Sequence, residues 1–268
     1  MAISKIPQHP RPPDYFYRIS MPSLPLDRIL QSQGFGTRKH CRQLITDGEV
    51  AVNGVAVRDY RQSFDTNALE FSLFDEVWRY REHVYIAMHK PSGHECSRKP
   101  SHHPPVIDLL PEQMRWRDVQ SVGRLDHDTT GLLLLSDDGA FIHAQSSPKR
   151  HIPKLYVATT YAPVTDDLLL ALRTGVQLID ESAPLAATHC RHLDEHAIEI
   201  ALEQGKYHQV KRMLAAAGNH CTTLCRVAIG GLTLEALGLA EGEWTFLETD
   251  QLAQLHASGT EYSVAVLA

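Results

Sequence analysis

The densest group of polar side chains lies in residues 123–133, which read Gly-Arg-Leu-Asp-His-Asp-Thr-Thr-Gly-Leu-Leu. Two carboxylates, Asp126 and Asp128, stand there between Arg124 and two threonines, just before an apolar run. An ionised carboxylate at the buried end of a strand needs a cationic partner, which Arg124 or a later lysine can supply. The segment is therefore a candidate for chemistry that depends on a carboxylate. The alternative is a polar loop in which an aspartate only caps a turn.

Other chemistries find less support in the residue spacing. Residues 94–103 and 220–225 are rich in histidine and cysteine, but neither segment contains a C-x-x-C pair or an H-x-x-x-H helix, so we predict no bound metal. On a strand, Asp126 and Asp128 would share one face and lack the opposed geometry of a glycosidase pair. No G-x-G-x-x-G opens a βαβ unit, which argues against a dinucleotide fold. A generic hydrolase would need a nucleophile pair or an activated water, and the sequence has no recognisable group for either.

Alternating strand and helix patterns position these side chains. A helix is predicted over residues 165–172 and another over residues 207–217, where apolar residues repeat at helical spacing from Val210 onward. The apolar face of the second helix points inward and leaves Lys211 and Arg212 on other faces. Strands are predicted over residues 84–88, 132–135, 155–160, 197–202 and 227–234.

The N-terminal region has a compact pattern of its own. Apolar residues at helical spacing begin at Leu26, and Thr37 is a good N-cap for a second helix. Asn53-Gly54 is a strong type I′ turn signal between two alternating strands, which completes an ααββ unit of about forty residues. Basic residues on the polar side of the second helix are either solvated or contact phosphates: Arg38, Lys39 and Arg42.

Charge is unevenly distributed along the 268-residue chain, whose formal net charge is −6. Residues 1–61 contain 9 Lys/Arg against 5 Asp/Glu, and the remainder contains 17 against 27. A basic head on an acidic body is typical of an added module that binds a polyanion, although chance clustering would give the same count.

Composition also indicates the cellular compartment of the protein. The longest leucine run has four residues, whereas a membrane helix needs ~20 apolar residues. The N-terminus lacks the apolar core of a signal peptide, so export is not expected. The five cysteines are an odd number, which favours free thiols in a reducing compartment. We therefore predict a cytoplasmic protein with no membrane segment.

Five ordered motifs together resemble one family. The segment GRLDHDTTGLLLLSDDG resembles the catalytic signature of the RsuA-type ribosomal RNA pseudouridine synthases. Four further pieces are similar to the family's other motifs and occur in the same order. They are Lys90-Pro91-Ser92-Gly93, Lys154-Leu155-Tyr156-Val157, residues 205–213 (GKYHQVKRM) and residues 226–232 (RVAIGGL). The ααββ head resembles a small RNA-binding module of the S-four type, and the resemblance covers about residues 24–250.

The resemblance implies an α+β fold. A small ααββ RNA-binding head, S-four-like, would precede a larger pseudouridine synthase domain built on a mixed, largely antiparallel sheet with flanking helices. The expected boundaries are a flexible extension over residues 1–22, the head over 23–65, a linker over 66–82 and the catalytic domain over 83–268.

The family converts uridine in ribosomal RNA to pseudouridine without a cofactor. The resemblance therefore implies an isomerase that acts on ribosomal RNA or a ribosome assembly particle, as a monomer, with no nucleotide cofactor and no membrane contact. Small-subunit RNA is the expected substrate, because residues 218–220 and 229–232 resemble that branch. The alternatives are a large-subunit uridine and an RNA-binding assembly factor without catalysis.

The resemblance also implies the roles of individual residues. Asp126 matches the essential aspartate, which can attack the sugar or the base or stabilise charge at C1′. Lys211 matches the basic partner of that aspartate, where many relatives have arginine, and Arg212 is the fallback. Tyr156 matches a tyrosine that stacks on the flipped base and takes part in proton transfer. Otherwise it would be a core strand residue.

Further positions are expected to contact RNA or the base. Arg124 would hold a phosphate or help to extrude the nucleotide. Lys154 and Arg212 would bind RNA together with the basic helix of the head, and Leu224 and Ile229 would form the apolar wall of the base pocket. Because the body is acidic, its basic surface must be local, with candidates Arg98, Lys99, Lys149, Arg150, Lys154, Lys206, Lys211 and Arg212.

Overall fold

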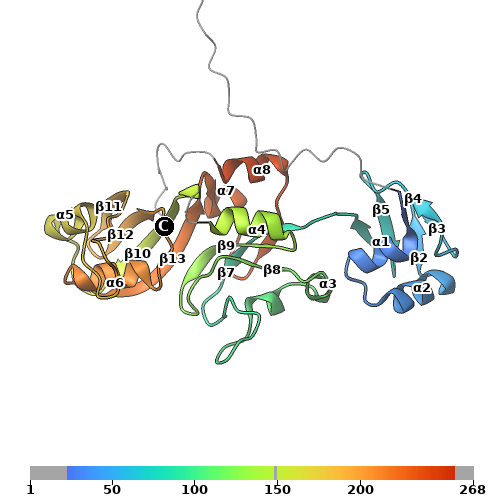
Figure 1. The fold of residues 1–268 in the computed structure, drawn as a ribbon, viewed down its shortest axis with the longest axis horizontal. Helices are drawn as coiled ribbons and strands as arrows, with labels where there is room; N and C mark the ends of the chain where they lie inside the picture. Colours follow the sequence, from blue (N-terminus) through green and yellow to red (C-terminus); the bar gives the residue numbers. More distant parts are fainter. Residues whose placement is uncertain (1–22, 148–149, 257–268) are drawn as a thin grey trace, which may run out of the picture. The chain divides into compact units, whose positions relative to one another are not determined.

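The computed structural model describes residues 23–147 and 150–256, so the extension predicted over residues 1–22 lies outside this part of the chain, as does Lys149. The chain divides between Glu82 and His83 into two compact units (Figure 1). Each unit has its own hydrophobic core, and each is described here by itself.

The N-terminal unit has the predicted ααββ arrangement. The Thr37 hydroxyl accepts a hydrogen bond from the His40 backbone N–H at 3.3 Å, which begins the second helix. Asn53 and Gly54 have φ angles of 50° and 76°, as a type I′ turn requires. The elements are β1 (Leu24–Pro25), α1 (Leu26–Ser32), α2 (Arg38–Asp47), β2 (Val50–Val52), β3 (Val55–Ala56), β4 (Ser63–Phe64), β5 (Glu70–Leu73) and β6 (Glu76–Arg79).

The segment predicted as a linker, residues 66–82, largely belongs to this unit. Strands β5 and β6 extend a sheet with the order β3-β2-β5-β6. Phe71 and Leu73 alternate with polar residues and lie in the core of the unit, at 2% and 5% exposure. Four-residue strands with only two inward side chains give a weak periodic signal, which is why this part of the chain resembled a linker.

The second unit contains a mixed, largely antiparallel sheet, as predicted. Its strand order is β11-β12-β10-β13-β9-β7-β15, with β14 beside β13 and β8 beside β9, and only the β9–β13 pair is parallel among the described residues. The strands are β7 (Tyr85–Lys90), β8 (Gln120–Val122), β9 (Thr130–Ser136), β10 (Lys154–Thr160), β11 (His189–Asp194), β12 (Ala197–Leu202), β13 (Cys221–Ile229), β14 (Leu232–Thr233) and β15 (Trp244–Phe246).

Helices flank this sheet (Figure 1). The apolar faces of α5 and α6 share one core with β10, β11, β12 and β13. None of the helices in the described ranges is long and apolar enough to cross a membrane. The helices are η2 (Val106–Leu109), α3 (Glu112–Trp116), α4 (Gly139–Ser146), α5 (Asp166–Thr174), α6 (Gln209–Ala216), α7 (Leu234–Leu237) and α8 (Thr249–Gln254).

The two central strands approach each other closely at one glycine. Gly131 in β9 has a φ of 108°, and a Cβ at this position would lie 2.3 Å from the backbone oxygen of Arg226 in β13. Any larger residue would push the strands apart. The close spacing of the two strands here depends on glycine, and the loop that carries Asp126 leads directly into this contact.

Candidate active site

A buried lysine holds the loop that carries Asp126. Lys90, the last residue of β7, is 0% exposed. Its Nζ donates hydrogen bonds to the backbone carbonyl oxygens of Pro91 (2.9 Å), His127 (3.2 Å) and Thr129 (2.9 Å). Burial lowers the pKa of Lys90, and nearby acidic groups oppose that shift. Two of the three acceptors belong to the loop, so Lys90 fixes the backbone on which Asp126 stands.

One ammonium group lies between two carboxylates. Nζ of Lys211, in α6, is 3.2 Å from Oδ2 of Asp126 and 2.6 Å from Oδ1 of Asp128. Burial acts to lower the pKa of Lys211, but the hydrogen bond to Asp128 and the charge of Asp126 raise it overall. Burial likewise acts to raise the pKa of Asp128, but Lys211 lowers it. The cluster therefore favours an ionised carboxylate beside a charged lysine.

A histidine contacts the other oxygen of Asp126. Nε2 of His208 lies 3.2 Å from Oδ1 of Asp126. His208 precedes α6 and has the left-handed φ of 46°, and its ring stacks on Tyr207 with a centroid distance of 3.8 Å. This turn explains why α6 begins at Gln209 rather than at the predicted residue 207. Asp126 is thus contacted by a different nitrogen at each carboxylate oxygen.

The cluster faces a cleft of about 730 Å³. Asp126 is 26% exposed at its side chain, so it is accessible from this cleft. Tyr156, in β10, also faces the cleft while packing against the two cores beside it. The remaining walls include side chains from the loops and strands around it, among them Glu95, His103, Arg124, His127, Gln145, Lys154, Tyr207, Arg226 and Ile229.

Two cations of neighbouring strands, Arg226 and Lys154, line the cleft. Arg226 in β13 is 4% exposed and donates a 2.7 Å hydrogen bond from Nε to the backbone oxygen of Leu132. Its Nη2 is buried and has no partner among the described residues. Burial and the charge of Arg226 lower the pKa of Lys154 to about 8. The cleft therefore contains both the Asp126 carboxylate and positively charged side chains.

Comparison with known proteins agrees with this geometry. The family model of RNA pseudouridylate synthase matches residues 84–216, and the S4 domain model matches residues 24–67. Ribosomal small subunit pseudouridine synthase A of Escherichia coli (strain K12) is 40% identical over 232 residues, which cover 86% of this chain and 99% of that protein. An RNA pseudouridine synthase of Bacillus subtilis (strain 168) is 34% identical over 235 residues, 86% of this chain and 98% of the relative.

The chain belongs to the RNA pseudouridylate synthase family. A crystal structure described as that of a pseudouridylate synthase has 33% sequence identity and a TM-score of 0.60, and the match covers 87% of this chain and 100% of that one. The relationship spans both units, so the pairing of an S4 domain with a synthase domain is confirmed, together with the predicted α+β fold.

The structure of this pseudouridylate synthase brings most of the predicted site residues together. Asp126, Tyr156, Arg124, Lys154 and Ile229 line the same cleft, and Lys211 contacts Asp126 directly. The apolar residue Leu224 lines a smaller adjoining cavity of about 80 Å³, which Asp126 and Tyr156 also border.

Arg212 does not reach the aspartate. Its Nη2 lies 3.3 Å from Oδ2 of Asp180, and its Nη1 donates to the backbone oxygen of Tyr207 at 3.3 Å. Lys211 and Arg212 are consecutive in α6, so they point about 100° apart around the helix. The fallback role of Arg212 as the partner of Asp126 is therefore wrong, and its predicted contact with RNA remains a separate hypothesis.

Two arginines of the basic helix of the S4 domain form ion pairs with a carboxylate of the same domain. Nε of Arg38 and Nε of Arg42 lie 2.8 Å and 2.7 Å from Oδ2 of Asp27, whose side chain is 2% exposed. Both arginine side chains remain 42% exposed. Lys39 is exposed and forms no ion pair within the described residues. Two guanidinium groups thus share a single buried negative charge, and Lys39 stays exposed on the same helix.

The histidine-rich loop is organised around the side chain of Glu95. The Glu95 carboxylate accepts hydrogen bonds from the backbone N–H groups of Ser101, His102 and His103. The ring of His103 stacks on that of His127 at a centroid distance of 4.3 Å. In residues 23–147 and 150–256, no three His, Cys, Asp or Glu side chains are grouped as a metal would require.

Sequence reasoning missed the roles of four residues of the site: Lys90, Asp128, His208 and Arg226. Each lies inside a motif that was recognised, so the motif was the available signal. Their roles depend on contacts between distant segments, such as the 83 residues that separate Asp128 from Lys211. Residue spacing alone does not show such a contact.

Proposed function

We propose that this enzyme isomerises a uridine of small-subunit ribosomal RNA, with Asp126 as the catalytic carboxylate. The observation that carries the proposal is the position of Asp126. It faces the cleft while Lys211 and His208 contact its two oxygens. The similarity to ribosomal small subunit pseudouridine synthase A over 99% of that protein supports this class of RNA. Such a substrate is encountered in the bacterial cytoplasm, where we expect the enzyme to act.

The reaction exchanges one glycosidic bond for another. The N1–C1′ bond breaks, the uracil rotates within the cleft and a C5–C1′ bond forms. The C5 proton then leaves to solvent and N1 takes up a proton, so the product is an isomer of uridine. The Asp126 carboxylate attacks C1′ or the base, or stabilises positive charge at C1′. Lys211 holds the carboxylate in place and compensates its charge. Because the product is an isomer of the substrate, the reaction needs no external group donor and no oxidant.

Tyr156 and the cations of the cleft bind the nucleotide. Tyr156 stacks on the uracil and takes part in proton transfer at its hydroxyl. The target base must leave its stack in the RNA at a cost of a few kcal/mol, so such contacts are required. Arg226 and Lys154 both line the cleft, and their positive charge attracts the phosphate of the target nucleotide. Arg124 and the S4 domain, through Arg38, Lys39 and Arg42, contact the flanking RNA.

The test is tritium release from small-subunit ribosomal RNA labelled at C5 of uracil. Wild type releases tritium, and Asp126→Asn lowers the rate at least about a thousandfold, as expected for a residue that touches the reacting atoms. Asp166→Asn is the matched control, because Asp166 is exposed in the first turn of α5 and should change the rate less than about twofold.

Other outcomes separate the alternatives. Tritium release from large-subunit RNA alone would contradict small-subunit RNA as the substrate but would still support the isomerisation. Absence of release from either RNA, with RNA affinity retained, would contradict catalysis and support an RNA-binding assembly factor. Equal rates for wild type and Asp126→Asn would remove Asp126 from the mechanism.

A further inference from the structure

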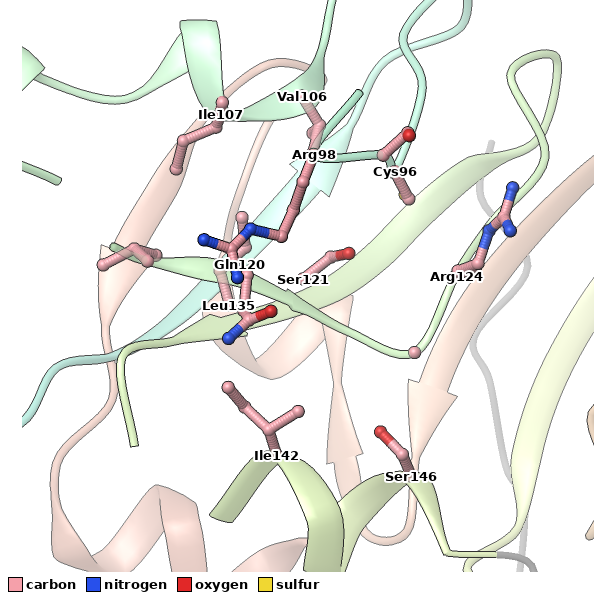
Figure 2. A pocket seen from close by; sticks show the side chains of 13 residues that line it. Cys96, Arg98, Val106, Ile107, Gln120, Ser121, Arg124, Leu135, Ile142 and Ser146 are labelled. Carbon is pink, nitrogen blue, oxygen red and sulfur yellow. The ribbon is translucent and has the colours of Figure 1, made fainter. Parts of the chain in front are cut away.

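A second cavity adjoins the catalytic cleft. It has a volume of about 280 Å³ and lies between η2, β8 and α4 (Figure 2). Residues 123–124, Cys96 and Ser146 line both spaces, so the two cavities meet at Arg124. The size is at the lower end of the range for pockets that hold small molecules, roughly 300–1,000 Å³, which suits a single planar ring.

The walls of this cavity are apolar on two sides. Val106 and Ile107 come from η2, and Leu135 and Ile142 face them from β9 and α4 (Figure 2). Val106 and Leu135 belong to the hydrophobic core at 3% and 0% exposure, so the accessible apolar surface comes from the partly buried Ile107 and Ile142. Two apolar faces with a gap between them can hold an aromatic ring by stacking.

Polar groups without partners line the same space. The side chains of Gln120 and Ser121, both in β8, form no hydrogen bond to any described residue, and the hydroxyl of Ser146 forms none either. An amide and two hydroxyls offer both donors and acceptors, which is what the edge of a nucleobase requires. Arg98 also lines the cavity (Figure 2) and forms an ion pair with Asp118.

Arg124 connects this cavity to the catalytic cleft. Its side chain is exposed and forms no hydrogen bond or ion pair within the described part of the chain. Consecutive nucleotides share one phosphate, and an arginine can bind it with two parallel hydrogen bonds. One uncommitted guanidinium that borders both spaces therefore matches a dinucleotide step.

We infer that the second cavity holds the base of the nucleotide adjacent to the target uridine. This inference rests on the proposed function, because the target uridine occupies the cleft beside it. The neighbouring base stacks between the η2 and α4 walls, and Gln120 and Ser121 hydrogen-bond to its edge. The cavity thus contributes to the choice of the uridine by recognising its neighbour in the strand.

The experiment first maps the pseudouridine that wild type forms in ribosomal RNA, and then uses a short RNA around that position. Abasic nucleotides replace the 5′ neighbour in one RNA and the 3′ neighbour in another. We expect one of these two changes to raise KM roughly tenfold, the loss of one stacked base, while kcat changes less than about twofold.

A double variant tests whether the cavity is the cause. Gln120→Ala with Ser121→Ala should raise KM severalfold on intact RNA. On the abasic RNA that raises the KM of wild type, the double variant should raise KM little further, because both changes remove the same contact. Ile142→Trp, which fills the cavity, should behave in the same way. Leu170→Trp is the control, since Leu170 is 59% exposed on α5 and its replacement should change neither constant. Thermal unfolding of each variant establishes that it is folded.

Two results would overturn the inference. One is equal activity of wild type on the intact RNA and on both abasic RNAs. The other is that the double variant raises KM by the same factor on that abasic RNA as on intact RNA, which would mean that the base lies elsewhere. Failure of the proposed function is separate, because wild type would then form no pseudouridine in the mapping step.

Discussion

The two units each contain a cluster of cations and carboxylates, but the ratio of cations to carboxylates is reversed between them. In the S4 domain two guanidinium groups, Arg38 and Arg42, share the carboxylate of Asp27. In the synthase domain one ammonium, Lys211, is shared by the carboxylates of Asp126 and Asp128. The first cluster has an excess of positive charge around a buried anion, and the second has an excess of negative charge at a cleft.

The side chains of Asp27 and Asp126 differ in exposure, and this difference indicates which one stabilises the fold and which one can act on a substrate. The Asp27 side chain is 2% exposed and both of its guanidinium partners are held by it, so it can only stabilise the fold. The Asp126 side chain is 26% exposed and borders the cleft, so it remains accessible to a substrate. Loss of the buried charge should therefore cost stability, whereas loss of the accessible charge should cost activity.

The largest effect after Asp126→Asn is expected at Lys211. Lys211→Met leaves Asp126 and Asp128 without their shared cation, and we expect kcat to fall about a hundredfold because the carboxylates then repel each other. Lys211→Arg keeps the charge and should retain at least about a tenth of the activity. Tritium release with both variants measures the difference, and equal loss in both would show that lysine geometry matters more than charge.

Asp27→Asn should lower stability and leave activity almost unchanged. Removal of the buried charge leaves Arg38 and Arg42 without their anion, and we expect the free energy of unfolding of the S4 domain to fall by about 3 kcal/mol. Denaturant unfolding of the full chain, with Trp116 and Trp244 replaced by Phe so that Trp78 is the single tryptophan, measures this loss by fluorescence. The rate on a short RNA that contains the target uridine should change less than about threefold. A large loss of activity without a loss of stability would contradict the comparison.

The same cluster predicts a dependence of stability on pH. Burial acts to raise the pKa of Asp27, but hydrogen bonds and charge from Arg38 and Arg42 lower it below its ordinary value of 3.8. A lowered pKa stabilises the folded state above the ordinary value, and this contribution is lost as the pH falls through the lowered value. The difference in unfolding free energy between wild type and Asp27→Asn should therefore be constant from about pH 5 to 7 and shrink below about pH 4. A difference that grows with acid would contradict this sign.

The smallest effect is expected at Lys39, which has no internal anion within the described residues. Lys39→Ala should weaken RNA binding a few-fold and reduce the slope of log affinity against log salt by about 1, the value for one phosphate contact. Gln43→Ala on the same helix is the neutral control, because Gln43 bonds only to Asp47 there. An unchanged salt slope for Lys39→Ala would indicate that this face of α2 does not bind RNA.

Local patterns predicted much of the fold. The cap at Thr37, the turn at Asn53-Gly54 and the apolar face of α6 were all found from neighbouring residues, because caps, turns and helix faces are determined by contacts within a few positions. The short strands β5 and β6 were missed, since four residues are too few to show a clear period. The start of α6 was missed by two residues because His208 adopts a left-handed conformation that its residue type does not predict.

The sequence by itself determined the order of the motifs, the identity of the candidate carboxylate and the pairing of an RNA-binding head with an α+β body. Only the tertiary structure decided which cation meets Asp126, since Lys211 lies 85 residues away and its neighbour Arg212 points elsewhere. It also decided that Lys90 supports the loop of Asp126 and that a second cavity opens at Arg124. The physical reason is that residue types set local geometry, whereas contacts across a sheet depend on how helices and strands pack.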